Sequence, residues 1–397
     1  FVGFVIEGVE ALPEAARLRG YARFLDGHTL QIDEHTRIHT QATVIATGSS
    51  PFIPPNLAGL GDRLLINDDI FELTDLPESV AVFGAGVIGI ELGQALHNLG
   101  VRMHLFGVRH NVGGLSDPML KDEAIRAFQA EFPFQPDARI ERVERVEAGV
   151  RVSWLDAHDQ EQSETFAYAL ATAGRRPNVA RLGLESLGVE LDRFGLPPFD
   201  RKTLQVGSLP VFLAGDANHV LPLLHEAADE GRIAGRNAAH YPRLEAGQRR
   251  APLAIVFTHP QIALVGQRFA ELQESHTAIG HVSFATQGRS RVMLENKGLM
   301  RIYADYTTGR FLGAEIFGPR AEHLAHLLAW AHQQQLTIEQ MLTMPFYHPV
   351  IEEGLRTALQ DTAHAIKLGP PPEPDCVMED PLEILATCGP EDPALKI

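Results

Sequence analysis

Residues 80–106 read VAVFGAGVIGIELGQALHNLGVRMHLF, and they carry the strongest structural signal in the chain. The apolar run at 80–83 is typical of a short strand, and it leads directly into a glycine-rich turn. An amphipathic helix is predicted to follow to about residue 99, and the run at 101–106 predicts a second strand. The segment is therefore expected to form a strand, a turn, a helix and a strand in that order.

Gly84, Gly86 and Gly89 form the pattern GxGxxG between the predicted strand and the predicted helix. Glycines at this spacing allow a tight turn, a close approach of backbone N–H groups to a pyrophosphate, and close packing of the helix on the strand. The N-terminus of the helix then attracts the phosphate charge. This context favours a dinucleotide-binding unit over an ordinary strand-to-helix turn, which is the alternative.

The end of the second strand indicates which dinucleotide is bound. NAD-binding units carry an acidic side chain about 20 residues beyond the glycines, where it accepts hydrogen bonds from the ribose hydroxyls. Gly107 occupies the corresponding strand end, and Arg109 follows it closely. A guanidinium without a carboxylate favours a 2′-phosphate, so NADP(H) is predicted over NAD(H). The alternative is that Arg109 is a solvated loop residue.

The composition limits the classes of protein to which the chain can belong. A length of 397 residues predicts two or three domains, and a hydrophobic content of 45% suffices for packed cores. The net charge of −17 argues against binding to nucleic acid. No apolar run of about 18 residues is present, so we expect no membrane span. The two cysteines exclude a disulfide scaffold and predict a cytoplasmic location.

The remaining sequence predicts strands on both sides of this unit and a third region near the C-terminus. Residues 1–50 alternate apolar runs with turn residues, which predicts a small antiparallel meander that ends in a buried strand at 42–49. Further strands are predicted over 137–175. The third region has predicted strands near 255–257, 281–284 and 299–303, and predicted helices at about 320–335 and 350–365.

Five ordered motifs together resemble the class I pyridine nucleotide-disulfide oxidoreductases, the family that includes dihydrolipoamide dehydrogenase. The resemblance covers nearly the whole chain except its C-terminal tail. The motifs are Ala46–Ser49 (ATGS), Gly84–Glu91 (GxGxxGxE), Gly174–Asn178 (GRxPN), Val211–Asp216 (a strand followed by Gly-Asp) and Phe257–Pro260, which resembles the start of the family's dimerisation domain.

The resemblance implies an α/β fold with tandem Rossmann-like FAD- and NAD(P)-binding domains, the first of them incomplete, and an α+β C-terminal dimerisation domain. The expected parts are a partial FAD-binding domain at 1–75 and 176–250, an NAD(P)-binding domain at 76–175, a dimerisation domain at 251–368 and a mobile acidic, proline-rich tail at 369–397.

The resemblance also assigns residues to the two expected cofactors, FAD and NAD(P), and implies no metal. Asp216 would bind the ribityl chain of the flavin, and Glu91 would point toward the nicotinamide amide. The residues expected near the flavin are Thr47, Gly48, Gly215 and Asp216, and those expected near the nicotinamide nucleotide are Gly84, Gly86, Gly89, Glu91 and Arg109. Gly174, in the GRxPN turn, is also expected to bind a cofactor.

The expected catalytic pair is His348 and Glu353 in the sequence FYHPVIEE. In the family, a His-Pro element opens a helix and a glutamate five residues later orients the imidazole. A carboxylate bonded to one ring nitrogen fixes the tautomer and raises the basicity of the other nitrogen. Pro349 suits the first position of a helix, so His348 is predicted to lie just before one. The resemblance implies that this histidine serves the opposite subunit of a homodimer.

Leu324, Leu327 and Leu328 recur at helical spacing in the predicted helix 320–335. We expect this stripe to be covered by the partner subunit of the homodimer, because a soluble acidic chain would not leave an apolar stripe exposed to solvent. The alternative is that the stripe packs on the domain's own sheet.

Two parts that the family requires are missing from this sequence. No earlier GxGxxG and no Cys-x₄-Cys redox pair precede residue 84, and the only cysteines are Cys376 and Cys388. Because the thiolate relays the electrons in this chemistry, the chain alone is expected to be inactive on disulfides. Truncation is the simplest explanation. The tail cysteines could substitute as a redox pair, and free surface thiols are the alternative.

The expected activity is a flavin-dependent transfer of electrons between NAD(P)(H) and a disulfide or dithiol such as lipoamide, which is a small molecule or is bound to a protein. One alternative is a catalytically inactive fragment or a nicotinamide-binding module. Another is a relative that resembles the transhydrogenases, which lack the cysteine pair, or mercuric reductase.

Overall fold

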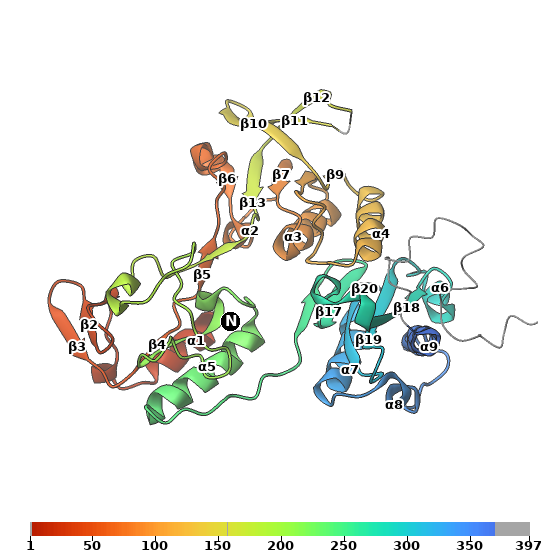
Figure 1. Cartoon of the computed structure of the whole chain (residues 1–397). Coiled ribbons are helices and arrows are strands. Elements are labelled where there is room, and N and C mark those ends of the chain that lie inside the picture. Colours follow the sequence, from red (N-terminus) through yellow and green to blue (C-terminus); the bar gives the residue numbers. More distant parts are fainter. Residues whose placement is uncertain (1, 157, 370–397) are drawn as a thin grey trace, which may run out of the picture. The chain divides into compact units, whose positions relative to one another are not determined.

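The computed structural model describes residues 2–156 and 158–369. Its backbone divides into two compact units, and each is treated by itself (Figure 1). Among the described residues, the first unit consists of those within Phe1–Gly114 and Phe128–Arg250. The second unit consists of those within Leu115–Ala127 and Ala251–Ile397. Beyond Gly369, the predicted tail lies outside the described residues, and so do Cys376 and Cys388.

The glycine-rich segment folds as predicted at the centre of a five-stranded sheet in the first unit. The strand order is β6-β13-β7-β8-β9, and every neighbouring pair is parallel. All five residues of β7 are buried, as expected for a central strand of a parallel sheet. The strands are β6 (Leu64–Leu65), β7 (Ser79–Phe83), β8 (Arg102–Phe106), β9 (Phe134–Gln135) and β13 (Tyr168–Ala171).

Short helices and a three-stranded antiparallel sheet accompany this parallel sheet. Val150, Val152 and Trp154 alternate along β11 and pack in one cluster with Phe83 and Phe106 of the parallel strands. The antiparallel sheet has the order β10-β11-β12. These elements are α2 (Asn67–Ile70), α3 (Val87–Asn98), β10 (Arg139–Val146), β11 (Gly149–Leu155) and β12 (Glu161–Phe166), whereas most of α4 (Pro118–Gln129) belongs to the second unit.

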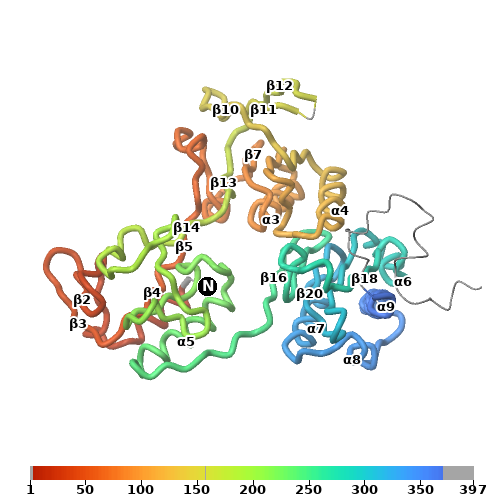
Figure 2. The backbone as a smooth tube through the Cα atoms, in the orientation of Figure 1, coloured from red at the N-terminus to blue at the C-terminus, as the bar shows by residue number. Residues whose placement is uncertain are grey.

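The rest of the first unit brings together segments that are far apart in the sequence. Strand β4 pairs in parallel with β15, and β5 pairs antiparallel with β14. Figure 2 shows β5 beside β14, although they are more than 120 residues apart in the chain. The predicted meander is present as β1-β2-β3, and the predicted buried strand is present as β4. These elements are β1 (Ala22–Phe24), β2 (Thr29–Ile32), β3 (Thr36–His39), β4 (Thr43–Ile45), β5 (Ser49–Pro51), β14 (Arg175–Pro177), β15 (Val211–Leu213) and α5 (Leu224–His240).

The meander prediction is wrong at the beginning of the chain, where α1 (Val2–Glu10) is a helix. Its β-branched and apolar residues suggest a strand, but a strand needs a neighbour for its backbone hydrogen bonds and a helix satisfies them internally. Residues 3–10 are all exposed, including Phe4 at 79%.

The second unit is built on a five-stranded antiparallel sheet of order β16-β17-β20-β19-β18. The predicted strands and both predicted helices of this region are confirmed, and β17, β20 and the two short helices were not predicted. The elements are β16 (Leu253–Val256), β17 (Gln261–Gly266), β18 (Thr277–Ser283), β19 (Leu299–Asp305), β20 (Phe311–Gly318), α6 (Gly288–Met293), α7 (Ala321–Gln333), α8 (Ile338–Leu342) and α9 (Glu353–Leu368). The fold is therefore α/β with a Rossmann-like sheet and a separate C-terminal sheet, as predicted.

The prediction that a partner covers the leucine stripe of α7 is wrong for two of its three leucines. Leu324 and Leu328 are fully buried in the core of their own unit, because α7 packs on the sheet. Leu327 is 43% exposed, and Trp330 on the same helix is 69% exposed. Among the described helices, none has both the length and the apolar character needed to cross a membrane.

Gly89→Ala is expected to destabilise the nucleotide sheet, because α3 touches the glycine turn at this residue. An added Cβ would lie 1.7 Å from the Gly84 carbonyl oxygen and 2.7 Å from Thr172 Oγ1. Overpacking of this kind lowers the free energy of unfolding by about 1–3 kcal/mol, measured by urea denaturation. Gly235→Ala is the matched control, because this exposed helical glycine has no atom within 4 Å of an added Cβ. Equal stability of Gly89→Ala and the wild type would contradict the close packing.

Candidate functional site

The three predicted glycines meet at the N-terminus of α3. Gly84 directly follows β7 and has a φ of 117°, and an added Cβ there would lie 2.4 Å from the Thr172 carbonyl oxygen. The Thr172 hydroxyl lies 3.0 Å from the Phe83 carbonyl oxygen and 2.9 Å from that of Gly84, and it donates to them. Gly86 is the residue before the first turn of α3. The backbone N–H groups of that first turn have no partners within the helix, so the turn is suited to bind an anion.

The loop after β8 folds back onto this glycine turn. The Gly113 N–H donates to the Ala85 carbonyl oxygen at 2.9 Å. Arg109 is exposed in this loop, and its φ of 56° lies in the left-handed region. Glu91, the expected nicotinamide contact, is half-buried on α3. The structure therefore brings Arg109 and the glycines into one neighbourhood of the first unit.

A carboxylate that the sequence reasoning missed also lies at this loop. The backbone N–H of His110 donates to Asp137 Oδ1 at 2.7 Å, and the ring Nδ1 lies 2.8 Å from Oδ2. The Ala138 N–H donates to the Gly107 carbonyl oxygen at 2.8 Å, which holds the segment containing Asp137 against the end of β8. Asp137 lies 27 residues after His110, outside any local motif, so its approach could not be inferred from spacing.

The motifs expected at the flavin converge on the hydroxyl group of Ser49. Arg175 Nε donates to Ser49 Oγ at 2.7 Å, and Arg175 Nη2 donates to the Ser49 carbonyl oxygen at 2.7 Å. Ser49 Oγ in turn donates to Asp216 Oδ2 at 2.9 Å. One hydrogen-bonded chain therefore joins β5, β14 and the turn after β15.

Asn178, in the GRxPN motif, is hydrogen-bonded to the ATGS motif. Its backbone N–H donates to the Gly48 carbonyl oxygen at 2.9 Å, and its side-chain amide donates to the Thr47 carbonyl oxygen at 3.0 Å. Gly48 and Gly174 have φ values of 69° and 109°, and an added Cβ at either would have no atom within 4 Å. Both glycines therefore face open space in the structure.

Asp216 lies in a short turn, Gly215–Asn218, that follows β15. Gly215 has a φ of 67°, and its N–H donates to Glu230 Oε2 at 2.8 Å. Helix α5, which carries Glu230, was not predicted from the sequence. A turn at the carboxyl end of a parallel strand is where open α/β sheets bind their ligands.

The expected catalytic pair is in contact in the second unit. His348 Nδ1 lies 2.8 Å from Glu353 Oε1, and the Val350 N–H donates to Glu353 Oε2 at 3.2 Å. The hydrogen bond from His348 is the main reason that the pKa of Glu353 is lowered from its ordinary value. The His348 side chain is 81% exposed, so the imidazole is held at one nitrogen and accessible from outside.

The prediction that Pro349 opens a helix is wrong. Helix α9 begins at Glu353, and the intervening residues form turns. The carboxylate of Glu353 accepts the Val350 N–H and the imidazole together, which satisfies the turn before the helix without helical backbone bonds. His348 therefore precedes the helix by a turn rather than directly.

Comparison with known proteins agrees with this geometry. The family described as pyridine nucleotide-disulphide oxidoreductase matches residues 7–231, and the dimerisation domain of the same family matches residues 253–359. Dihydrolipoyl dehydrogenase of Geobacillus stearothermophilus is 30% identical over 358 residues, which are 87% of this chain and 74% of the relative. NAD(P)H dehydrogenase (quinone) of Mycobacterium tuberculosis is 30% identical over 394 residues, which are 92% and 75% of the two chains.

Solved structures show the same fold. LpdA from Mycobacterium tuberculosis aligns with a TM-score of 0.70 at 26% identity, over 86% of this chain and 74% of the other. The HOCl-induced flavoprotein disulfide reductase RclA from Escherichia coli aligns with a TM-score of 0.72 over 86% and 78% of the two chains. At 21% identity the likeness to RclA concerns the fold alone. With its motifs, its two sheets and these matches, the chain belongs to the pyridine nucleotide-disulphide oxidoreductase family and carries that family's dimerisation domain.

Proposed function

We propose that the chain belongs to a homodimeric, flavin-dependent oxidoreductase that moves electrons between NADP(H) and a disulfide or dithiol such as lipoamide, and that residues 1–397 alone, without a Cys-x₄-Cys pair, are inactive on disulfides. The observation that carries this proposal is the chain of hydrogen bonds from Arg175 through Ser49 to Asp216. In this assignment the NAD(P)-binding domain is 76–175, the partial FAD-binding domain is 1–75 with 176–250, and the dimerisation domain is 251–368. Family membership supports FAD and a pyridine nucleotide as cofactors, and the dimerisation domain supports the homodimer.

The residues around Asp216 fit the polyol and ring of a flavin. The carboxylate accepts a hydrogen bond from Ser49 and lies in the turn that follows a parallel strand, and an acceptor there suits the hydroxyls of a ribityl chain. The open space beside Gly48 and Gly174 leaves room that side chains would fill. When bound, a flavin supplies the two-electron chemistry that links a nicotinamide to a disulfide. The side chains of this chain supply only binding, orientation and proton transfer.

His348 would hold and release the proton of a thiol at Nε2. Glu353 accepts a hydrogen bond from Nδ1, so it selects the tautomer in which Nε2 is the basic nitrogen. Because the imidazole is largely exposed within its own unit, it is available to the flavin site of a partner subunit. The pair therefore acts as an acid and base toward thiols, and Glu353 is its positioning residue.

The preference for NADP(H) rests on Arg109 and is strengthened by the position of Asp137. A carboxylate at this loop would favour NAD(H) if it could accept the ribose hydroxyls. Both oxygens of Asp137 are already engaged by His110, at 2.7 Å and 2.8 Å. These contacts hold the Asp137 carboxylate against His110, and Arg109 supplies the positive charge that a 2′-phosphate requires.

A second function is favoured by one feature of the sequence. The chain has two cysteines, Cys376 and Cys388, so residues 1–375 hold no thiol to relay electrons from a flavin to a disulfide. A flavin could still reduce an acceptor that needs no thiol, and one relative is named a quinone-linked NAD(P)H dehydrogenase. Reduction of a quinone but not of lipoamide would favour this function.

FAD added to the purified chain is expected to bind, and Asp216→Ala should weaken binding about tenfold to a hundredfold, because a charged hydrogen bond is lost. Flavin fluorescence during titration measures both constants. Asp192→Ala is the control, because this carboxylate caps its own exposed turn by accepting the Phe194 N–H at 2.8 Å. A wild-type chain that binds no FAD would remove the flavin from the proposed function and leave a nicotinamide-binding module.

The wild type should bind NADPH more tightly than NADH, and Arg109→Ala should abolish the difference. A charged contact with the 2′-phosphate contributes about 1.5–3 kcal/mol, which is roughly tenfold to more than a hundredfold in affinity. Calorimetric titration of both nucleotides measures it. Arg151→Ala, at an exposed arginine of the antiparallel sheet, should change neither affinity. Equal affinities in the wild type would defeat the NADP assignment.

His348→Ala should raise the pKa of Glu353 toward the ordinary glutamate value of about 4.3, because the main hydrogen bond that favours the carboxylate is lost. In the wild type, Glu353 is ionised at neutral pH and keeps its hydrogen bond with His348. This hydrogen bond is lost as the pH falls through the lowered pKa of Glu353 and the carboxylate is protonated. Carbon NMR of the side-chain carboxyl follows the titration. Arg356→Ala should raise the pKa less, because its charge acts only at a distance. An unchanged Glu353 titration in His348→Ala would show that the pair does not form in solution.

A further inference from the structure

Helix α5, which belongs to the first unit, carries two buried carboxylates on one face. Glu226 is 4% exposed and Glu230 is 3% exposed. They are four residues apart, about one helical turn, so they lie above one another on the same face. A buried carboxylate is stable only when its oxygens are hydrogen-bonded and its charge is paired.

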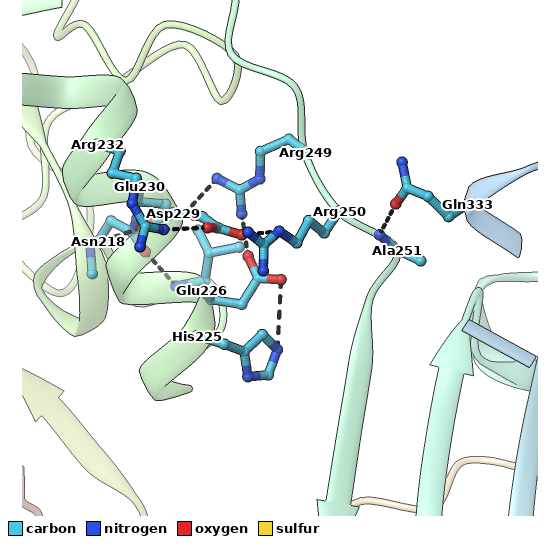
Figure 3. Close-up of polar contacts among 12 residues, drawn as sticks. Asn218, His225, Glu226, Asp229, Glu230, Arg232, Arg249, Arg250, Ala251 and Gln333 are labelled. Carbon is cyan, nitrogen blue, oxygen red and sulfur yellow. Dashed lines mark hydrogen bonds and ion pairs between the residues drawn. The ribbon is translucent and has the colours of Figure 1, made fainter. Parts of the chain in front are cut away.

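A single arginine beyond the helix bridges both carboxylates (Figure 3). Arg249 Nη1 lies 2.8 Å from Glu230 Oε1, and Arg249 Nη2 lies 2.6 Å from Glu226 Oε2. The planar guanidinium presents its two donors in a fixed fork, which suits two acceptors at once. Removal of Arg249 would take the guanidinium away from both buried carboxylates and leave Glu226 with His225, whose Nε2 lies 4.0 Å from Glu226 Oε1.

The second oxygen of Glu230 holds the turn that contains Asp216. Glu230 Oε2 accepts the Gly215 N–H at 2.8 Å and the side-chain amide of Asn218 at 2.6 Å. These two residues are the first and last of the turn, and Asn218 is 3% exposed. Both ends of the turn are therefore fixed by one carboxylate, and Asp216 lies between them.

The segment that carries Arg249 connects the two units of the chain. The first unit ends at Arg250, and the next residue, Ala251, already belongs to the second unit. There the Ala251 N–H donates to Gln333 Oε1 of α7 at 2.6 Å (Figure 3). Arg249 thus connects this segment, through Glu230, to the turn after β15.

We propose that Glu230 and Arg249 are positioning residues for the flavin, an inference that rests on the proposed function. Arg249 neutralises and orients Glu230, Glu230 fixes the Gly215–Asn218 turn, and the turn presents the Asp216 carboxylate to the hydroxyls of the polyol. Binding of the flavin at Asp216 consequently depends on Arg249, a side chain of the connecting segment. Arg249 acts through Glu226 and Glu230, which lie outside the five sequence motifs.

Hydrogen exchange of the full chain without FAD tests the positioning directly. Arg249→Ala should speed amide exchange in residues 214–219 about tenfold, since a charged hydrogen bond is typically worth that factor or more. Exchange over β7 should stay unchanged, because a local loss of positioning does not open the parallel sheet. Arg250→Ala is the matched control: it removes the neighbouring arginine, whose Nε lies 3.1 Å from Asp229, and should leave residues 214–219 as in the wild type.

FAD titration of the same variants tests the consequence for the flavin. Arg249→Ala should raise the dissociation constant about tenfold, and Arg249→Lys should recover part of the loss because it restores the charge without the fork. Glu230→Gln keeps the shape of the side chain. It replaces one acceptor oxygen with an NH₂ donor and also removes the negative charge. If Arg249→Ala fails to fold, Glu230→Gln is used in its place and is expected to show the same faster exchange over 214–219 and the same weaker FAD binding.

Three results would overturn the inference: exchange over 214–219 in Arg249→Ala equal to that in Arg250→Ala, an acceleration spread equally over β7, or FAD affinities that all match the wild type. A wild-type chain that binds no FAD would overturn the proposed function and the flavin role with it. The exchange rates of the FAD-free chain would still decide whether Arg249 and Glu230 position the turn, so the two failures are distinguishable.

Discussion

Ser49 Oγ accepts a hydrogen bond from Arg175 at 2.7 Å and donates one to Asp216 at 2.9 Å, so one hydroxyl joins segments 126 and 167 residues apart. The two short strand pairs of this region have only three residues per strand, and this junction adds to the few backbone hydrogen bonds that hold them. A hydroxyl can serve as donor and acceptor at once, whereas a second carboxylate could only repel Asp216. The proposed flavin site follows from this arrangement.

The buried carboxylates of both units follow a common rule, although the chain has a net charge of −17. In the second unit, Glu315 is fully buried and accepts backbone N–H groups from Ser116 at 2.7 Å and Asp117 at 3.1 Å. Asp117 is bonded in turn by Arg301 at 2.9 Å and by the hydroxyl of Tyr303 at 3.0 Å. Burial, aided by the nearby carboxylates, raises the pKa of Tyr303, so its hydroxyl stays protonated and donates. Glu226 and Glu230 are held in the same way by Arg249, and such burial is stable only with these partners.

Errors in the sequence-based predictions occurred where a tertiary neighbour chooses between local alternatives. The apolar start of the chain was expected to belong to a meander of strands but forms α1, in which the backbone satisfies its hydrogen bonds within the helix. Leu324 and Leu328 were expected to face a second subunit, yet they pack on their own sheet, since periodicity shows that a face is apolar but not what covers it. Helix α5 was missed because small residues and buried carboxylates, which are held by partners distant in the sequence such as Arg249, replace the usual apolar stripe.

The sequence by itself determined the strand, glycine turn and helix at 79–98, the α/β class, the family and the spacing of His348 and Glu353, because each of these depends on residues close together in the chain or on motifs in a set order. Only the tertiary structure decided that Asp137 engages His110, that Ser49 meets Asp216 and that Glu230 holds the turn at Gly215. The reason is physical. Each of these contacts satisfies a polar group by a partner that the sheet pairings bring close, and distance along the chain does not predict which partner that is.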